Sequence, residues 1–400
     1  MLESMTSSIL LCMGTRPDII KMAPVYHALM KTDLKPLVLH TGQHDTLAEE
    51  LYPFFDMKPD YIFDLTRERK SLGHLFSITM EHLDKLFSQI NTSAVLVHGD
   101  TSTALSSALA AFYHKIPVGH VEAGLRSHHD YEPFPEEKNR ELISRLSRWH
   151  FAPTQRAMNN LHSEGIRKDD CYLVGNSIVD SVTWTEKHIE QPSFIPEPES
   201  QKIMQWLESS GEKNKLILVT AHRRESWDGQ IAEIARGIKA ITEKHPDIRV
   251  IWPVHPNPVV KNAVHMILQG VDSGKRKQVW LCEPVNCPDM LYFMKRSWLV
   301  LTDSGGVQEE SMTLKVPVLV LRDRTERPEV IESHGGALIG TSAASILKWV
   351  NALYTDTEKY NSYKVVSNPF GDGSTADTIA YILNNDLLNN NSVELTAGIK

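Results

Sequence analysis

Residues 301–310 are LTDSGGVQEE, and an apolar run at 298–301 leads into them. The run predicts a buried strand, and a helix can begin at Val307. Between them stand two residue types that cap helices and two glycines that let a backbone approach a ligand closely, namely Asp303, Ser304, Gly305 and Gly306. A strand, a turn of small residues and a helix N-terminus form an anion site, because free N–H groups and the positive end of the helix dipole face one point. The alternative is an ordinary turn between a strand and a helix.

The rest of the chain repeats this order of strand and helix. Apolar, β-rich segments predict strands at 9–13, 36–40, 94–98, 117–121, 149–151, 172–174, 216–220, 249–253, 278–282, 298–301 and 317–321. Helices are expected between them, including those at 17–30, up to about residue 55, and at 71–90, 101–113 and 135–147. Strict alternation predicts the α/β class, with parallel sheets covered by helices on both faces.

A proline-rich segment separates the two halves of this pattern. Residues 191–200 are QPSFIPEPES and predict a linker, with GNSIVD at 175–180 as a hinge before it. We therefore expect two doubly wound, Rossmann-like domains with a cleft between them, at 1–178 and 179–370. The segment 371–400 is expected to be a helix to about Asn384 followed by a mobile polar tail.

The composition argues against a nucleic-acid or membrane partner. The 400 residues are 41% hydrophobic and 23% charged, with a formal net charge of −8 at pH 7. A negative net charge disfavours binding to nucleic acid or to an anionic membrane. The four cysteines form no CxxC pair, which fits a reducing compartment. Because no signal peptide and no apolar run near the ~18 residues of a membrane span is found, we expect a cytoplasmic protein.

Cationic residues follow the first strand of each half. Arg16 and Lys21 lie beside the start of the first helix, an arrangement that holds a diphosphate; the alternative is that both are solvated surface charges. Residues 222–224, His-Arg-Arg, take the same place in the second half. Carboxyl ends of parallel strands meet at one edge of a sheet. The residues expected to suit a diphosphate there are Arg16, Lys21, His222, Arg223, Ser304, Gly305, Gly306 and Arg327.

Carboxylates form the second group of candidates, all in the first half. Glu122 directly follows a strand and caps nothing obvious, so we predict that it is functional. Asp100 stands where a helix N-cap residue would, and capping is its alternative role. Glu136 and Glu137 both open a helix, where one of them can support the helix dipole. Carboxylates beside an anion clamp, without the spacing of metal ligands, indicate acid–base work on a group attached to the phosphate.

A series of short motifs then points to a known family. GTRPDIIKMAP, TGQH, HGDT, HVEAGLR, PFPEEKNR, GNSIVD, TAHRRES, PVHPNP, TDSGGVQEE and RTERPE occur in order across almost the whole chain. Together they closely resemble the non-hydrolysing UDP-N-acetylglucosamine 2-epimerases. The resemblance implies a fold like that of the GT-B glycosyltransferases, with the C-terminal helix crossing back onto the first domain. It also implies a homodimer, interconversion of UDP-GlcNAc and UDP-ManNAc, and no metal or redox cofactor.

Through the same motifs, the resemblance also implies roles for individual residues of this sequence. In the family, UDP is eliminated to give 2-acetamidoglucal and is then added back with H2 on the opposite face, a step that feeds cell-surface polysaccharide synthesis. The resemblance makes Asp100, Glu122 and Glu136 the acid–base candidates, with His222 holding or activating the diphosphate. It leaves open which carboxylate serves which face. The residues it implies for substrate binding are Arg16, Lys21, Arg223, Met290, Ser304, Gly305, Gly306, Glu310 and Arg327.

The sequence departs from the family at two places. Met290 stands in the uracil loop where the family commonly has an aromatic residue. Some members bind a second UDP-GlcNAc as an activator, and Asp45 and Thr46 replace the basic and Gln residues common in that site. The residues that do match the activator site are Gln43, His44, Arg69, Glu136 and His255.

Several other functions share parts of this pattern. The alternatives are a GT-B glycosyltransferase that uses a UDP-sugar and an acceptor, and an epimerase of a related UDP-2-acetamido sugar. A hydrolysing relative and a non-catalytic sugar-nucleotide sensor complete the set. A transferase does not need three carboxylates together with the RTERPE loop, which favours the epimerase.

Overall fold

A computed structural model of the chain describes residues 7–43, 50–65, 69, 71–209, 211, 214–221, 229–271, 277–364 and 367–397, with side chains to residue 388. The chain divides into two compact units. Unit 1 comprises Met1–Ser181 and Phe370–Lys400, and unit 2 comprises Val182–Pro369. The sequence predicts the divisions at 178/179 and 370/371. Three candidate residues, His44, His222 and Arg223, lie outside the described residues.

Unit 1 is built on a parallel sheet with the strand order β3-β2-β1-β4-β5-β6-β7. The strands are β1 (Ser8–Met13), β2 (Lys35–His40), β3 (Tyr61–Ile62), β4 (Ala94–His98), β5 (Val118–Val121), β6 (Trp149–Ala152) and β7 (Cys171–Leu173). The helices are α1 (Arg16–Leu29), α3 (Leu51–Phe54), α4 (Leu72–Phe87), α5 (Ser102–Tyr113), α6 (Glu136–Leu146), α7 (Gln155–Ser163), the short η1 (Lys168–Asp170) and α17 (Thr375–Ala397). A further helix, α8 (Ser177–Ile189), begins in unit 1 and ends in unit 2.

Unit 2 repeats the topology of unit 1 in its own parallel sheet, with the order β10-β9-β8-β11-β12-β13. Its strands are β8 (Lys215–Thr220), β9 (Ile248–Pro253), β10 (Val279–Cys282), β11 (Leu299–Thr302), β12 (Val318–Val320) and β13 (Gly336–Leu338). Its helices are α9 (Pro198–Ser209), α10 (Gln230–Lys244), α11 (Pro258–Leu268), α12 (Cys287–Arg296), α13 (Gly305–Thr313), α14 (Pro328–Glu332), α15 (Ala343–Thr355) and α16 (Thr357–Ser362).

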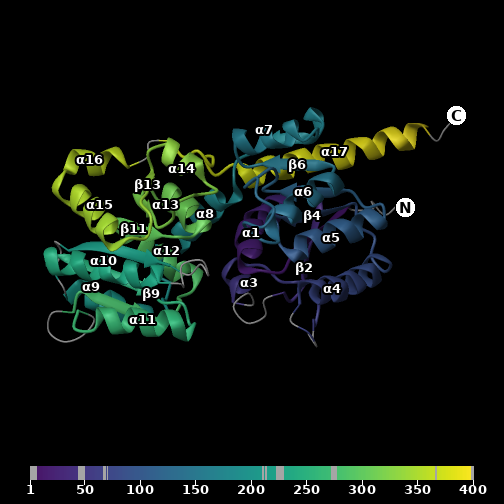
Figure 1. The fold of residues 1–400 in the computed structure, drawn as a ribbon. Helices are drawn as coiled ribbons and strands as arrows, with labels where there is room; N and C mark the ends of the chain where they lie inside the picture. The colour runs from purple at the N-terminus through teal and green to yellow at the C-terminus, as the bar shows by residue number, and fades with distance from the viewer. Residues whose placement is uncertain are drawn as a thin grey trace. The chain divides into compact units, whose positions relative to one another are not determined.

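Helices cover both faces of each sheet. In unit 1, α5 packs between α4 and α6, while α1 packs against α17 (Figure 1). In unit 2, α10 packs between α11 and α15, and α13 packs against α12 and α14. The strands between these layers of helices are continuous apolar runs, as expected for parallel sheets that are buried on both faces. The predicted α/β class is therefore confirmed.

In both sheets the strand order reverses between the first and fourth strands, which are β1 and β4 in unit 1 and β8 and β11 in unit 2. Parallel doubly wound sheets bind ligands outside the carboxyl ends of their strands at such a switch point. The loops after these four strands are therefore the places at which to look for a site. The turn after β11 is the LTDSGGVQEE segment.

The proline-rich segment 191–200 lies inside unit 2 rather than at its boundary. Two hydrogen bonds attach it to that unit: Glu197 N donates to Asp289 Oδ2 at 3.0 Å, and Trp280 Nε1 donates to Glu199 Oε1 at 3.0 Å. The first division between the units falls within α8 instead. Prolines here mark a turn on the surface of a unit.

The expected end of the last helix near Asn384 is wrong, because α17 continues to Ala397. Apolar residues recur at helical spacing along its buried side, at Ile379, Leu383 and Leu387. Trp149 Nε1 also donates to Asp386 Oδ2 at 2.7 Å, which attaches the helix to β6. The abundance of asparagine hid this periodicity in the sequence.

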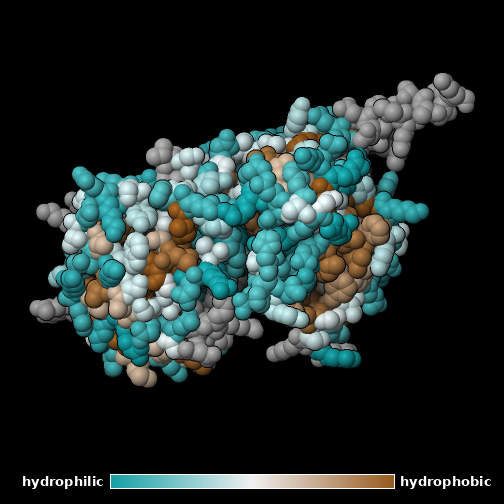
Figure 2. Space-filling model, turned by 45° about the horizontal axis from the view of Figure 1, so that its top comes forward, coloured by the Kyte–Doolittle hydropathy of each residue, from teal (hydrophilic) through white to brown (hydrophobic). Residues whose placement is uncertain are grey.

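The visible surface is mostly hydrophilic, with hydrophobic side chains gathered in patches on both units (Figure 2). Two large apolar side chains at the end of α5 are more than half exposed, Phe112 at 55% and Tyr113 at 67%. Among the described residues, no helix is both long enough and apolar enough to cross a membrane.

Candidate active site

Glu122 is the centre of a buried polar cluster in unit 1. It follows β5 directly, with φ at 65° in the left-handed region that a non-glycine residue rarely adopts, and its side chain is 8% exposed. Its Oε2 forms an ion pair with Lys21 Nζ and accepts a hydrogen bond from Asn176 Nδ2 at 2.7 Å. Its Oε1 lies 3.8 Å from His98 Nε2. Backbone strain of this kind is common where a side chain has to be aimed at a ligand.

His98 connects Glu122 to the first helix. It ends β4, and its Nδ1 lies 3.3 Å from Asp18 Oδ1. Asp18 Oδ2 in turn accepts from the backbone N–H groups of Gly14 and Thr15, at 3.1 and 3.0 Å, as part of the capping box of α1. Burial alone lowers the pKa of His98, but the carboxylates of Asp18 and Glu122 outweigh it and raise the pKa to about 9. His98 is therefore a cation at neutral pH.

Lys21 and Glu122 were predicted as members of two separate groups, and the structure brings them together. Lys21 lies on α1, with its side chain 7% exposed, and the two residues are 101 positions apart in the sequence. The strand order β1-β4-β5 makes the contact possible, because α1 follows β1 and Glu122 follows β5. Arg16 is the first residue of α1 and is half-buried.

Asp100 is attached to α6 instead of capping a helix. Arg140 donates to Asp100 Oδ2 from Nε at 2.7 Å and from Nη2 at 2.6 Å, and Asn139 Nδ2 donates to the Asp100 carbonyl at 2.7 Å. The N-cap of α5 is the next residue, Thr101, whose Oγ1 accepts from Ala104 N at 3.1 Å. The alternative role of Asp100 as a helix cap is therefore wrong.

The two glutamates that open α6 have different surroundings. Glu137 is 1% exposed, and its carboxylate accepts from the backbone N–H groups of Ser127 and His128 at 2.8 to 3.0 Å. It also pairs with Arg140 Nη1 at 3.2 Å. Glu136, the first residue of the helix, is half-buried. Glu137 thus fastens the loop after Glu122 to α6, which leaves Glu136 as the acid–base candidate of the pair.

The LTDSGGVQEE segment in unit 2 forms the predicted turn, with the helix beginning earlier than expected. Ser304 is the N-cap of α13, and the helix starts at Gly305 rather than Val307 because both glycines take helical backbone angles. A Cβ on Gly306 would meet no described atom within 4 Å, and one on Gly305 would lie 3.8 Å from the Arg327 guanidinium. Among the described residues, little besides that guanidinium therefore lies close to the two glycines of this first turn.

Arg327 is fastened behind this turn. Its Nε donates to Oε1 of Glu309, a fully buried carboxylate on α13. Thr325 links the same loop to α13 by donating to Gln308 Oε1 at 3.0 Å, and it accepts from the Arg327 backbone N–H at 3.0 Å. The sequence analysis placed Arg327 at the ligand but gave Glu309 no role.

The remaining candidates stand on several elements of the two units. Glu310 on α13 and Met290 on α12 are half-buried. Of the expected activator residues, Gln43 Oε1 accepts from Thr103 N and Oγ1 at 3.1 and 2.9 Å, and Arg69 is exposed. His255 Nδ1 accepts from Asn257 N at 3.2 Å.

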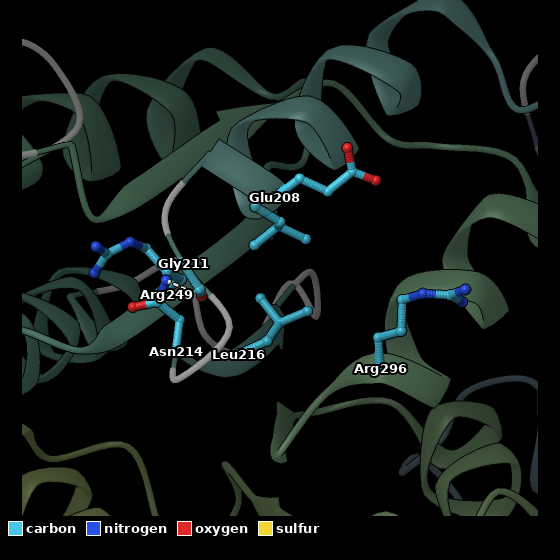
Figure 3. Close-up of a pocket in the computed structure, with 7 residues that line it drawn as sticks. Glu208, Gly211, Asn214, Leu216, Arg249 and Arg296 are labelled. Carbon is cyan, nitrogen blue, oxygen red and sulfur yellow. Dashed lines mark hydrogen bonds between the residues drawn. The ribbon is translucent and has the colours of Figure 1, made fainter.

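A cavity of about 420 Å³ lies elsewhere in unit 2, at the amino ends of the strands. It is lined by Leu207, Glu208, Gly211, Asn214, Leu216, Arg249 and Arg296. Figure 3 shows the side chains of Arg249 and Arg296 pointing away from one another, so they do not converge on an anion. Because ligands of parallel sheets bind at the carboxyl ends, this cavity is not the candidate site.

Three residues of the unit 1 cluster were missed in the sequence analysis, although each stands in a quoted motif. Asp18 belongs to GTRPD, His98 to HGDT and Asn176 to GNSIVD. Their positions directly after, or at the end of, predicted strands were the available signal. Their burial was not visible in the sequence.

Comparison with known proteins shows the family of this chain. A family model described as UDP-N-acetylglucosamine 2-epimerase matches residues 27–384. A Yersinia pestis protein of that name is 39% identical over 378 residues, covering 94% of this chain and 98% of that protein.

Two solved structures have a similar fold. The Neisseria meningitidis UDP-GlcNAc 2-epimerase bound to UDP-GlcNAc has a TM-score of 0.86 and 36% identity, covering 94% of this chain and 99% of that chain. The Methanocaldococcus jannaschii UDP-GlcNAc 2-epimerase in complex with UDP-GlcNAc and UDP has a TM-score of 0.76 and 34% identity, covering 95% and 99%. On the family match and these similarities, the chain belongs to the UDP-N-acetylglucosamine 2-epimerase family.

Proposed function

We propose that this chain reversibly inverts C2 of UDP-N-acetylglucosamine to give UDP-N-acetylmannosamine, without hydrolysing the sugar nucleotide. Family membership supports the reaction, and the two solved relatives named above bind UDP-GlcNAc. The observation that carries the proposal is the buried Glu122, aimed by a left-handed backbone and surrounded by Lys21, His98 and Asn176 at the carboxyl edge of a parallel sheet.

The reaction proceeds by elimination and re-addition. A carboxylate removes the proton from C2, the C–H electron pair becomes the C1=C2 double bond of 2-acetamidoglucal, and the C1–O bond breaks with its electron pair on UDP. Re-addition forms the C1–O bond again while a proton is delivered to the opposite face of C2. Two proton-transferring groups are needed, one for each face, and each contributes about 10²- to 10⁴-fold.

Glu122 is one of these groups, and Asp100 or Glu136 serves the other face. Two cations beside Glu122, Lys21 and His98, favour the ionised carboxylate that can accept a proton. Arg140 contacts Asp100 Oδ2 from Nε and from Nη2 and so fixes the position of that carboxylate. The contacts of these carboxylates do not decide which of them serves which face of C2.

The turn after β11 holds the leaving group. Backbone N–H groups at the start of α13 and the positive end of its dipole stabilise the charge that develops on UDP as the C1–O bond breaks. Arg327 places its guanidinium beside Gly305, where Glu309 holds it by an ion pair. Holding UDP until re-addition is what separates an epimerase from an enzyme that releases the sugar.

Incubation of the purified chain with UDP-GlcNAc alone in D2O, followed by proton NMR, tests the proposal. UDP-ManNAc should appear with deuterium at C2. Free ManNAc would indicate hydrolysis instead. No change without an acceptor would favour a transferase, a sensor or another sugar substrate.

We further propose that the product feeds cell-surface polysaccharide synthesis and that the active protein is a homodimer. The exposed Phe112 and Tyr113 on unit 1 are consistent with a buried role in an assembly. Sedimentation of the purified chain distinguishes a dimer from a monomer of 45.2 kDa.

A further inference from the structure

We propose that Asn176 is a positioning residue that orients Glu122 and ties it to the segment through which the chain returns from unit 2 to unit 1. The inference rests on the proposed function, since it assigns Glu122 the proton at C2. Asn176 is 2% exposed, so its action on the reaction passes through Glu122 and not through contact with substrate.

Every polar group of Asn176 has a partner. Its side-chain Nδ2 donates to Glu122 Oε2 at 2.7 Å, and its Oδ1 accepts from Ile178 N at 3.0 Å. Its backbone N–H donates to the Phe370 carbonyl at 2.7 Å, and its carbonyl accepts from Val179 N at 3.0 Å. Asn176 therefore caps the start of α8, orients Glu122 and is hydrogen-bonded to the segment that returns from unit 2.

Two glycines bring the returning segment close to Asn176. Gly175 and Gly371 have φ of 90° and 116°, and a Cβ on Gly175 would lie 3.0 Å from the Phe370 carbonyl oxygen. Asp180 Oδ1, one turn along α8, accepts from Ala376 N at 3.0 Å and so fastens the start of α17 to the same place. Both passages of the chain between the units begin or end here, at Ser181 and Phe370.

An amide side chain fits both of the side-chain contacts. It donates to a carboxylate with one atom and accepts from a helix N–H with the other, whereas a carboxylate accepts only and a lysine donates only. Lys21 donates to the same Glu122 oxygen, so two donors on different elements fix Oε2. Proton transfer is sensitive to such placement, because a displacement of about 1 Å can cost about 100-fold in rate.

Two variants separate this role from a purely structural one. Asn176→Ser keeps an acceptor for the N–H groups of α8 but has no amide to reach Glu122. We expect kcat for UDP-GlcNAc to fall about 10- to 100-fold while KM changes less than about threefold, because UDP is bound by unit 2. Asn176→Asp keeps the cap and adds a negative charge beside Glu122, so the low-pH limb of kcat/KM should move up by about one pH unit.

Asn368→Asp is the matched control. Asn368 is close to the same passage in the sequence, and its Nδ2 donates to Thr313 Oγ1 at 3.1 Å within unit 2. The same change there should leave the pH profile unmoved. Thermal unfolding of all three variants shows that each is folded.

The inference is overturned if both Asn176 variants keep kcat within about twofold of the wild type and the pH limb does not move, or if Asn368→Asp moves the limb equally. These outcomes require an active wild-type protein. A wild-type chain that exchanges no deuterium at C2 would instead contradict the proposed function.

Discussion

The Glu122 cluster in unit 1 and the α13 turn in unit 2 occupy equivalent edges of two sheets with the same topology, yet they are built from different groups. In unit 1, titratable side chains hold one another: Lys21 and His98 lie against Glu122, and His98 against Asp18. In unit 2, the turn presents backbone N–H groups and glycines, and its charged pair, Glu309 with Arg327, is buried.

The difference matches two chemical tasks. Moving a proton requires a side chain whose charge and position are fixed by neighbours, because both set the rate. Holding a diphosphate requires dipoles that a ligand can approach, and a side chain on the turn would stand in the way. On the proposed function, one order of strands supports both tasks through the choice of residues that follow the strands.

The largest effect is expected at Glu122. Glu122→Gln keeps the shape of the side chain but cannot accept the C2 proton, so C2 exchange should fall about 10³- to 10⁴-fold. UDP affinity, measured by titration calorimetry, should change less than about threefold, since UDP is assigned to unit 2. Glu164→Gln, which alters an ion pair with Arg126 in the same unit, is the control and should retain exchange. Wild-type exchange in Glu122→Gln would place the proton chemistry elsewhere.

A smaller effect is expected at Arg140, which pairs with both Asp100 and Glu137. Arg140→Gln leaves the buried Glu137 without its cation, and losing one partner of a buried pair costs roughly 3–5 kcal/mol of unfolding free energy. Turnover should fall as Asp100 loses its orientation. Arg140→Lys keeps the charge without the two-point contact and should be intermediate. A melting temperature unchanged in Arg140→Gln would show that the pair contributes no stability.

The pH dependence of stability should reveal His98. Its pKa in the folded protein, about 9, lies above the unfolded value of 6.5. The contribution of His98 to the free energy of unfolding is at most about 3 kcal/mol. It is therefore fully present below pH 6.5 and is lost as the pH rises through 9. Denaturant unfolding should show the advantage of wild type over His98→Gln shrinking across that range.

His120 is the control, because its effect on stability has the opposite dependence on pH. Burial lowers its pKa to about 3, so the unfolded chain binds the extra proton below pH 6.5 and wild-type stability falls on acidification. A His120→Gln variant should lose that acid sensitivity but keep the loss between pH 6.5 and 9. If the difference in unfolding free energy between wild type and His98→Gln were the same at pH 6.5 and at pH 9, it would contradict the raised pKa assigned to His98.

The smallest effect is expected at the glycine turn. Gly306→Ala adds a methyl group that meets no described atom within 4 Å, so the folded chain tolerates it and gains up to about 1 kcal/mol from helix propensity. UDP affinity should nevertheless fall about tenfold, or about 1.4 kcal/mol, if the ligand occupies that space. Gly73 is the matched control, because it also is the second residue of its helix and also has open space. Equal UDP affinity in the two alanine variants would remove α13 from the binding site.

Much of the fold could be predicted because each long strand is a continuous apolar run. The strands at 94–98 and 216–220, for instance, match β4 and β8 to within a residue. The missed strands, β3 and β13, have two and three residues at the edges of their sheets and show no such run. Strands this short form because a neighbour offers hydrogen bonds, which a local pattern does not record.

The candidate site was predictable in its loops but not in its contacts. Carboxylates and glycines that directly follow predicted strands indicated Glu122, Asp100 and the turn at Gly305 and Gly306. The pairing of Lys21 with Glu122 depends on the strand order β1-β4-β5, which alternation alone leaves undetermined. The separate roles of Glu136 and Glu137 likewise depend on which of two adjacent side chains is buried against Arg140.

The central claim is that unit 1 moves the proton and unit 2 retains UDP. The most direct measurement is proton NMR of UDP-GlcNAc in D2O, comparing C2 deuteration with free 2-acetamidoglucal for Glu122→Gln and Gly306→Ala. The account predicts neither product from Glu122→Gln, and from Gly306→Ala continued deuteration with more glucal released than from wild type. Deuteration at the wild-type rate by Glu122→Gln would contradict it.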